Sequence, residues 1–389
     1  MNLWDIQAAL RDQRFDGWLF YDHHHRDPIA YRVLGLPESL FVTRRWYYLI
    51  GAQGEPVKLV HRIEAGHLDS LPGRKLEYSS WQEQQNNLRA MVAPYHTIAM
   101  QYSPNNQIPY IGLVDAGTVE LVRSFGKEIV SSGDLVSQFE ATWTDEQVES
   151  HFAARDAIDR ITEEAFREIG RRVRDGGTHE FDIQQWIDEA LRRAGLTNEN
   201  EPPIVAVNAD SANPHYSPTA ESSKPIREGD FVLLDIWGKM QTPGAVYYDI
   251  TWTGFVGKTP SDRIRRIFEV VCGARDAGVK AVQSAVAEGR PIAGWQVDEA
   301  VRDHIARAGY GQYFIHRTGH SIATSVHGNG PNMDNLETRD ERTILPNTCF
   351  SIEPGIYLAE FGVRSEVNML VRPRAAEVTG RIQREIVII

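Results

Sequence analysis

Residues 350–370 of this chain read Phe350-Ser-Ile-Glu353-Pro-Gly-Ile-Tyr-Leu-Ala-Glu-Phe-Gly-Val-Arg-Ser-Glu366-Val-Asn-Met-Leu370. It places two carboxylates, Glu353 and Glu366, in segments whose apolar composition predicts buried strands. Burying a charge is costly unless another group pairs with it. These two acids therefore predict a positively charged partner, and a metal ion is the first candidate.

An earlier part of the chain carries a second pair of acids in the same setting. Asp235 ends the apolar run Phe-Val-Leu-Leu-Asp, and Asp249 follows Ala-Val-Tyr-Tyr after a turn that contains Gly and Pro. Asp235 precedes Glu353 by 118 positions (353 − 235), and Asp249 precedes Glu366 by 117 (366 − 249). This nearly constant offset predicts two copies of one ribbon.

The segments before the two ribbons also repeat. A capping-box sequence, Thr144-Asp-Glu-Gln147, predicts the start of a helix that runs to about residue 173, and a second helix is expected over about 180–194. Short echoes follow 110 to 120 positions later, at 274–277, 298–300 and 308–309. We therefore expect residues 141–389 to be two copies of helix, helix and strands about a pseudo-twofold axis. Such packing brings the four acids together at the centre.

The first 140 residues read as a separate α/β domain, so the expected domains are 1–140 and 141–389. Adjacent side chains in a strand point to opposite faces, so His23, His24 and His25 cannot all bind one ion, and a polar loop after a strand is expected there. The elements predicted in this domain are helices over 3–10 and 115–125, strands over 17–21, 97–100 and 128–130, and a hairpin of 46–50 with 57–60.

Composition limits the classes of function. The chain has 389 residues and a formal net charge of −12, which argues against nucleic acid as a partner. Two cysteines, Cys272 and Cys349, are too few for a disulfide framework, and Cys349 is expected to be an inert core residue. We find neither a signal peptide nor an apolar run of membrane-spanning length, so we expect a cytoplasmic protein without a membrane partner.

A segment rich in histidine lies before the second ribbon and reads His316-Arg-Thr-Gly-His320-Ser-Ile-Ala-Thr-Ser-Val-His327. Four acids and a histidine, with no thiolate, suit divalent manganese, zinc, cobalt or iron. Five protein ligands are many for one ion but suit two ions that share carboxylate bridges. Two such ions can activate water and polarise a carbonyl group.

Taken in order, these residues resemble the ligand set of the pita-bread metallopeptidases, which include methionine aminopeptidase, aminopeptidase P and prolidase. The set comprises Asp235, Asp249, His320, Glu353 and Glu366. The motifs His316-Arg-Thr-Gly-His320 and Gly-Val-Arg364 point to the prolidase and aminopeptidase P branch. The resemblance covers about residues 144–385. It implies an α/β amino-terminal domain of the creatinase/prolidase type, followed by an α+β pita-bread domain with an internal pseudo-twofold repeat.

The resemblance also implies a role for each metal ligand. Asp235 would be a terminal ligand of one ion and His320 a terminal ligand of the other, while Asp249 and Glu366 would bridge the two. Glu353 would bind the second ion and act as general base toward the bridging water. The implied cofactors are two divalent ions, with manganese first and zinc, cobalt or iron as alternatives.

Four further residues match substrate-side positions of that family. His215 would be a substrate-side histidine, and His327 would stabilise the tetrahedral intermediate. His316 would lie at the proline end of the substrate. Arg364 would either hold a substrate carboxylate or orient Glu366.

The sequence departs from the family pattern around this site. The ribbon from Asp235 to Asp249 is three residues longer than usual, and Trp252, Ser321, Ala323 and Gly328 replace other residues. None of these changes removes a metal ligand. All of them are expected near the substrate pocket, so they affect the choice of substrate more than the chemistry.

The function expected from the resemblance is hydrolysis of Xaa-Pro bonds in dipeptides or short peptides by a metal-activated bridging hydroxide. Such bonds lack an N–H group and have a restricted φ. One alternative is a creatinase-like hydrolase, or a lyase, acting on a small non-peptide substrate. Another is a metal-free interaction module. A homodimer fits the family.

Overall fold

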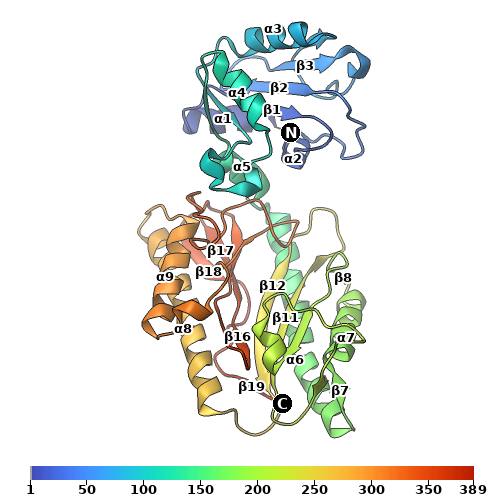
Figure 1. The fold of residues 1–389 in the computed structure, drawn as a ribbon, viewed down its shortest axis with the longest axis vertical. Coiled ribbons are helices and arrows are strands. Elements are labelled where there is room, and N and C mark those ends of the chain that lie inside the picture. Colours follow the sequence, from blue (N-terminus) through green and yellow to red (C-terminus); the bar gives the residue numbers. More distant parts are fainter. Residues whose placement is uncertain (1) are drawn as a thin grey trace. The chain divides into compact units, whose positions relative to one another are not determined.

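The computed structural model describes residues 2–389, which form two compact units, one ending at Glu140 and the other beginning at Ala141. The first unit contains a six-stranded mixed sheet in the order β4-β3-β2-β1-β5-β6. Its neighbouring strands β1, β2 and β3 are labelled in Figure 1. Its strands are β1 (Gly17–Asp22), β2 (Trp46–Gly51), β3 (Val57–His61), β4 (Arg74–Tyr78), β5 (Thr97–Met100) and β6 (Glu128–Ser131).

Helices cover both faces of this sheet because successive strand residues point to opposite sides. Trp18 and Phe20 pack with one group of helices, and Leu19 and Tyr21 pack with the other. The first group is α1 (Leu3–Asp12), α2 (Pro28–Leu34) and α5 (Gly133–Glu140), and the second is α3 (Trp81–Val92) and α4 (Ala116–Ser124). The elements predicted for this unit are confirmed, but α2, α3, α5 and β4 were not predicted from the sequence.

The run of three histidines forms a loop directly after β1, as predicted. His24 and His25 have left-handed backbone conformations, with φ of 61° and 55°. The buried carboxylate of Asp22 holds the loop, because it accepts hydrogen bonds from three successive backbone N–H groups, those of His25, Arg26 and Asp27, at 2.7–3.1 Å.

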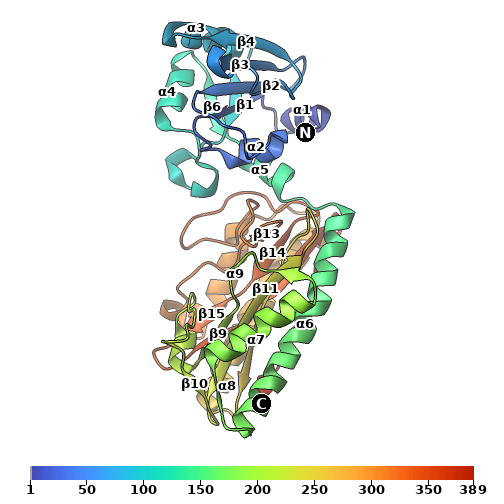
Figure 2. The same cartoon turned by 90° about the vertical axis from the view of Figure 1, so that its right-hand side faces the viewer.

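The second unit begins with two helices, and a sheet packs against them (Figure 2). The capping box at Thr144 is confirmed at the start of α6. The helices are α6 (Asp145–Arg174) and α7 (Glu180–Arg193), and the sheet order is β19-β12-β11-β8, with β9 also paired to β11. The strands are β8 (Leu196–Thr197), β9 (Ile204–Val207), β11 (Phe231–Met240), β12 (Tyr248–Phe255) and β19 (Val387–Ile388). A short ladder joins β7 (Thr178–His179) to β10 (Pro225–Ile226).

The same order of elements then recurs, which confirms the predicted internal repeat. Helices α8 (Asp262–Ala287) and α9 (Gly294–Arg307) precede a sheet in the order β13-β14-β17-β18. Its strands are β13 (Ser321–Ile322), β14 (Cys349–Ile352), β17 (Val367–Arg372) and β18 (Ala375–Val378), and β15 (Gly355–Tyr357) pairs with β16 (Gly362–Arg364). Cys349 is buried in β14, as expected.

The two halves of the second unit meet where β12 lies beside β17. The Asn368 side chain accepts a hydrogen bond from the Asp249 backbone N–H at 2.9 Å and donates one to the Asp249 carbonyl at 2.7 Å. The Glu366 N–H also donates to the carbonyl of Thr251 at 3.3 Å. None of the helices within residues 2–389 is long and apolar enough to cross a membrane.

His151 of α6 is fully buried in the second unit, and both of its ring nitrogens are engaged. Its Nδ1 lies 2.7 Å from the Tyr247 carbonyl oxygen and its Nε2 lies 2.8 Å from the Thr379 hydroxyl. A carbonyl only accepts, so Nδ1 carries the proton and Nε2 accepts from Thr379. This neutral ring satisfies both contacts, and burial lowers the pKa of His151 from 6.5 to about 4.

We expect this histidine to make the unit sensitive to acid. The unfolded chain binds its proton below pH about 6.5, whereas the folded chain does so only below about 4. Folding stability therefore falls as the pH drops through this window, by about 3 kcal/mol from this group. The loss of stability between pH 7 and 4, measured by denaturant unfolding, is expected to be smaller for His151→Gln than for wild type. Parallel curves would contradict this assignment.

Candidate metal centre

The alternation of side chains along β11 and β12 decides which residues of the first ribbon face the site. The ladder between β11 and β12 is unbroken, and Asp235 pairs with Thr251 while Trp237 pairs with Asp249. The alternate residues Val232, Leu234, Ile236, Tyr248 and Ile250 pack against the cluster formed with α6 and α7. Asp235, Asp249 and Thr251 therefore lie together on the opposite face, away from the helices.

Glu353 and Glu366 occupy the matching place in the second ribbon, immediately outside its strands. Strand β14 ends at Ile352 because Pro354, two residues later, has no N–H group to continue the ladder. Ile352 pairs with Val367, so the two acids just beyond this last pair lie on neighbouring chains. The sequence placed both acids within strands, and the structure places them at strand ends.

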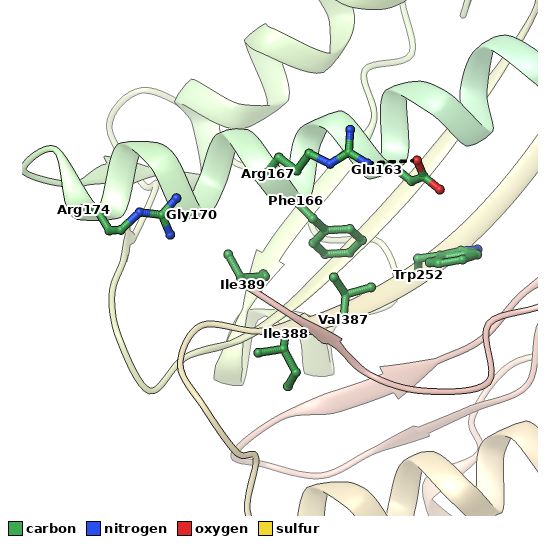
Figure 3. Close-up of a pocket in the computed structure, with 9 residues that line it drawn as sticks. All are labelled: Glu163, Phe166, Arg167, Gly170, Arg174, Trp252, Val387, Ile388 and Ile389. Carbon is green, nitrogen blue, oxygen red and sulfur yellow. Dashed lines mark hydrogen bonds and ion pairs between the residues drawn. The ribbon is translucent and has the colours of Figure 1, made fainter.

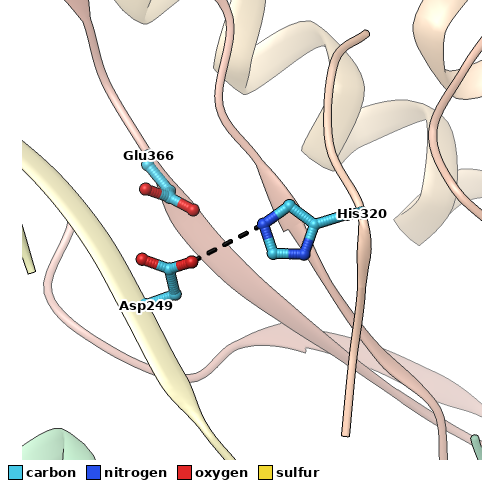
Figure 4. A group of neighbouring side chains, drawn as sticks. All are labelled: Asp249, His320 and Glu366. Atoms are coloured by element: carbon cyan, nitrogen blue, oxygen red, sulfur yellow. Dashed lines mark ion pairs between the residues drawn. The ribbon is translucent and has the colours of Figure 1, made fainter. Parts of the chain in front are cut away.

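Three of the five predicted ligands form a compact group (Figure 4). Asp249, His320 and Glu366 are buried, and each offers a ligand atom within 4.8 Å of the others. His320 Nε2 lies 3.5 Å from Asp249 Oδ2 and 3.4 Å from Glu353 Oε1. Glu353 therefore adjoins the group through the histidine.

His320 reaches this position because the preceding glycine lets two backbone segments touch. A Cβ atom on Gly319 would lie 2.0 Å from the carbonyl oxygen of Ser351, so no larger residue fits there. The Ser351 hydroxyl accepts the backbone N–H of His320 at 2.9 Å. The Thr-Gly-His sequence thus fixes the histidine against β14.

Three buried carboxylate oxygens in this site have no hydrogen-bond partner among the described residues. They are Asp235 Oδ1, Asp249 Oδ1 and Glu366 Oε1. A buried charged oxygen without a donor is strongly unfavourable. Asp249 and Glu366 also offer ligand atoms within 4.8 Å of each other and of a His320 nitrogen, and carboxylate oxygens with an imidazole have the chemistry of ligands for hard to borderline divalent ions. The residues present therefore fit the metal ions that the sequence implies.

The second carboxylate oxygens of Asp235 and Glu366 are held by side chains of this chain. Arg364 donates to Asp235 Oδ2, and the Thr251 hydroxyl donates to Glu366 Oε2 at 2.9 Å. Arg364 Nε in turn donates to Thr251 Oγ1 at 3.0 Å. The Thr251 hydroxyl thus links Arg364, the partner of Asp235, to Glu366.

The charges of the site displace the pKa values of its members. Burial raises the pKa of Asp235 to about 7 despite the nearby guanidinium of Arg364. Burial, with the carboxylates of Asp249 and Glu353, raises the pKa of Glu366 well above its usual value. Burial disfavours the charged form of His320, but the carboxylates of Asp249 and Glu353 outweigh it and raise its pKa. The site carries an excess of negative charge that cations would neutralise.

The other three predicted histidines differ in their surroundings. His215 is exposed, and the carbonyl of the preceding Pro214 accepts a long hydrogen bond from Arg364 at 3.5 Å. His327 is exposed, and its ring centroid lies 4.3 Å from that of His320. Both nitrogens of His316 are engaged, Nδ1 with the Arg317 carbonyl at 2.6 Å and Nε2 with the Tyr357 hydroxyl at 2.7 Å.

One of the sequence departures lies away from the site, contrary to expectation. Trp252 lies on the helix-facing side of β12, because it is one residue out of step with Asp249 and Thr251. It lines a cavity of about 460 Å³ beside α6, together with Phe166 and Ile389 (Figure 3). The strand's alternation of side chains explains this error.

Three residues at the site were not singled out from the sequence. Thr251 and Tyr357 support Arg364, since Tyr357 accepts from Arg364 at 3.2 Å while contacting His316. Trp237 is half-buried on the site face opposite Asp249. The alternation of side chains along β11 and β12 places Trp237 and Thr251 on the same face as Asp235 and Asp249, so both could have been identified from the sequence. Nothing in the sequence indicates the contacts of Tyr357.

Comparison with known proteins gives both a family match and similar individual proteins. Residues 155–373 match metallopeptidase family M24. A putative Xaa-Pro aminopeptidase of Mycoplasma pneumoniae is 31% identical over 233 residues, which cover 58% of this chain and 60% of that protein. An Xaa-Pro dipeptidase of Lactobacillus helveticus is 36% identical over 192 residues, 49% of this chain and 48% of that protein. The matches thus span less than two thirds of either relative.

The fold has close counterparts among solved structures. The dipeptidase PepE of Mycobacterium ulcerans superposes with a TM-score of 0.70 at 24% identity and covers 99% of this chain and 96% of that one. An Xaa-Pro dipeptidase of Bacillus anthracis superposes at 0.64 with 22% identity, covering 100% and 99%. These likenesses confirm the expected fold class, with a pita-bread unit after an α/β unit. With the matched segment covering more than half of the sequence, the chain belongs to metallopeptidase family M24.

Proposed function

We propose that this protein is a dinuclear-metal hydrolase that cleaves Xaa-Pro bonds in dipeptides or short peptides. The observation that carries the proposal is the buried group of Asp249, His320 and Glu366, whose ligand atoms lie within 4.8 Å of one another; both acids, like Asp235, have a buried oxygen without a partner among the described residues. The ions would be held by Asp235, Asp249, His320, Glu353 and Glu366. Manganese is the first choice, because oxygen-rich sites suit it, and zinc, cobalt and iron are alternatives.

The substrate is inferred from the relatives and from the chemistry of the bond. Relatives described as Xaa-Pro dipeptidase or putative Xaa-Pro aminopeptidase share the matched segment. A bond before proline has no N–H group and a fixed φ, so an enzyme that engages extended backbone through N–H groups handles it poorly. A site that acts on the carbonyl and on water avoids this difficulty.

Glu353 is the best-placed residue to move a proton. When bound, divalent ions would supply Lewis acidity toward the scissile carbonyl and toward water. The Glu353 side chain is 16% exposed, whereas that of Asp249 is 7% exposed. Its Oε1 accepts from the Ser351 hydroxyl at 3.1 Å, which leaves Oε2 to take a proton from the attacking water and return it to the proline nitrogen.

The neighbouring residues would bind and orient the substrate. His215 and His327 are exposed, His215 follows a residue that contacts Arg364, and the His327 ring lies beside that of His320, which suits contacts with the reacting carbonyl. Arg364 is already engaged with Asp235, so we assign it to orienting that ligand. Since both His316 nitrogens are engaged, His316 would contact the proline ring through its apolar edge.

Peptide hydrolysis with added manganese tests the function. We expect turnover of an Xaa-Pro dipeptide and no turnover of the matched Xaa-Ala dipeptide, and a tripeptide with the same first two residues separates dipeptidase from aminopeptidase action. A fully metal-loaded protein that cleaves no Xaa-Pro peptide would contradict the proposal. That result would favour a small non-peptide substrate, because Ser321, Ala323 and Gly328 alter the segment beside His320. The homodimer and the cytoplasmic location stay predictions.

Thr251 provides a test of the metal site that does not depend on activity. Thr251→Val keeps the shape of the side chain but removes the donor to Glu366 and the acceptor for Arg364. We expect it to bind manganese about 10- to 100-fold more weakly in calorimetric titration, as is typical for partners of metal ligands. Thr251→Ser keeps the hydroxyl and should bind as wild type does. Equal affinities for the valine and serine variants would exclude this role.

A further inference from the structure

The segment that carries His215 is a long connection between two short strands. It leaves β9 at Val207 and returns to β10 at Pro225, and His215 lies exposed near its middle. An exposed histidine on such a segment has no fixed position unless nearby residues are held. The anchors of the segment 208–224 therefore decide where His215 sits.

The buried carboxylate of Glu180 accepts hydrogen bonds from three places along or next to this segment. Glu180, the first residue of α7, is fully buried. Its Oε1 accepts the backbone N–H of Val207 at 2.8 Å. Its Oε2 accepts the backbone N–H of Lys224 at 2.8 Å and the Tyr216 hydroxyl at 2.6 Å. The carboxylate thus contacts both ends of the segment and the residue next to His215.

These contacts are strong because the acceptor is charged and water is excluded. A buried carboxylate is tolerated when donors surround it, and hydrogen bonds to an ionised acceptor are about twice as strong as neutral ones. Removing any one of the three donors leaves part of the Glu180 charge buried without a hydrogen bond, which is unfavourable. The Tyr216 hydroxyl is therefore a firm side-chain anchor beside the histidine.

The segment is also tied toward the metal centre. The Ser211 hydroxyl accepts the N–H of Gly362 at 2.9 Å, and the Pro214 carbonyl accepts from Arg364 at 3.5 Å. Gly362 and Arg364 belong to β16. Between these contacts and the Tyr216–Glu180 anchor, the backbone of His215 is held from both sides.

We propose that Glu180 and Tyr216 are positioning residues that hold His215 in place for the substrate. The inference rests on the proposed function, in which His215 contacts the substrate. Neither residue touches the substrate itself. Tyr216→Phe removes one donor from Glu180 and frees the middle of the segment. Glu180→Gln does more, because its NH₂ group must face at least one of the N–H or O–H donors.

Hydrogen exchange measures the anchor directly. We expect Tyr216→Phe to raise amide exchange in residues 208–224 by about tenfold or more, the equivalent of one hydrogen bond to a charged group. The matched control is Tyr78→Phe, which removes a tyrosine hydrogen bond of 2.7 Å to the Arg45 carbonyl in the first unit. The control should leave exchange in 208–224 unchanged. Unchanged exchange in Tyr216→Phe would overturn the inference.

A double-mutant cycle with His215→Ala tests whether the anchor acts through the histidine. For Xaa-Pro hydrolysis we expect Tyr216→Phe to raise KM several-fold with a smaller change in kcat, and to add nothing in the His215→Ala background. Additive effects would overturn the inference. If His215→Ala alone leaves hydrolysis unchanged, the proposed role of His215 fails and the positioning role falls with it. In that case Tyr216→Phe would still raise amide exchange in residues 208–224, which would show that the anchor exists but does not act through His215.

Discussion

Glu353→Gln is expected to lower kcat/KM for an Xaa-Pro dipeptide by about 10²- to 10⁴-fold while the protein keeps its metal ions. Glutamine retains the size of the side chain and one ligand oxygen but cannot take a proton from water. The hydrogen bond from Ser351 and the contact with His320 survive the exchange. Steady-state kinetics and metal analysis on the same sample check both parts of the expectation.

A control for this variant lies seven residues further along the chain. Glu360 is 60% exposed in its side chain and pairs with Arg263. Glu360→Gln removes the same charge from the surface and should keep wild-type kinetics. Retention of more than a tenth of the wild-type activity by Glu353→Gln would rule out its role as the base. Loss of both ions would show that the residue is chiefly a ligand.

The second large effect is on stability. Manganese should raise the Tm of the wild-type protein in proportion to the logarithm of its concentration, and 100-fold excess over Kd corresponds to about 2.7 kcal/mol. Glu366→Gln removes one of the buried acids that face each other. We expect it to unfold at the same or a higher temperature than wild type in the presence of a chelator, because glutamine avoids the cost of burying an acid whose pKa is raised by burial and by the carboxylates of Asp249 and Glu353.

When manganese is added, the wild-type protein should unfold at a higher temperature than Glu366→Gln. Glu366→Gln has lost a charged ligand oxygen, Glu366 Oε1, that has no partner among the described residues, so manganese should stabilise it little. Scanning calorimetry of both proteins with chelator and with manganese would show the crossing. Glu377→Gln, at a half-exposed surface position, is the control and should follow wild type in both conditions. A manganese-induced rise in Glu366→Gln equal to that of wild type would contradict the ligand assignment.

The sequence was sufficient to predict the duplicated ribbon, because acids in apolar strands are rare enough to stand out. Asp235 and Asp249 both lie on strands as expected, and helices α6 and α7 begin where the sequence predicted. The position of Trp252 could also have been predicted, since it directly follows Thr251, lies three residues from Asp249, and strand side chains alternate. Here the interpretation was wrong although the necessary pattern was present.

Other features depend on contacts that no local pattern contains. Arg364 pairs with Asp235 across 129 positions, whereas the sequence suggests a substrate carboxylate or Glu366, two residues away, as its partner. Thr251 is an ordinary strand residue until Glu366 is brought next to it. Glu180 resembles any acid in the first turn of a helix, and only the fold places Val207, Tyr216 and Lys224 around it. Such partners follow from the packing of the two halves.

The contact of Asn368 with Asp249 joins the two halves of the second unit, and this division has a consequence for how the halves dock. Asp235 and Asp249 come from the first half, and His320, Glu353 and Glu366 come from the second, with only residues 256–261 connecting β12 to α8. Binding energy at such a shared centre is also docking energy between the halves. If the chain were cut within 256–261, neither fragment would carry all five proposed ligands. Metal uptake by a mixture of the two fragments would then report their reassembly, with bound metal acting as a reversible cross-link.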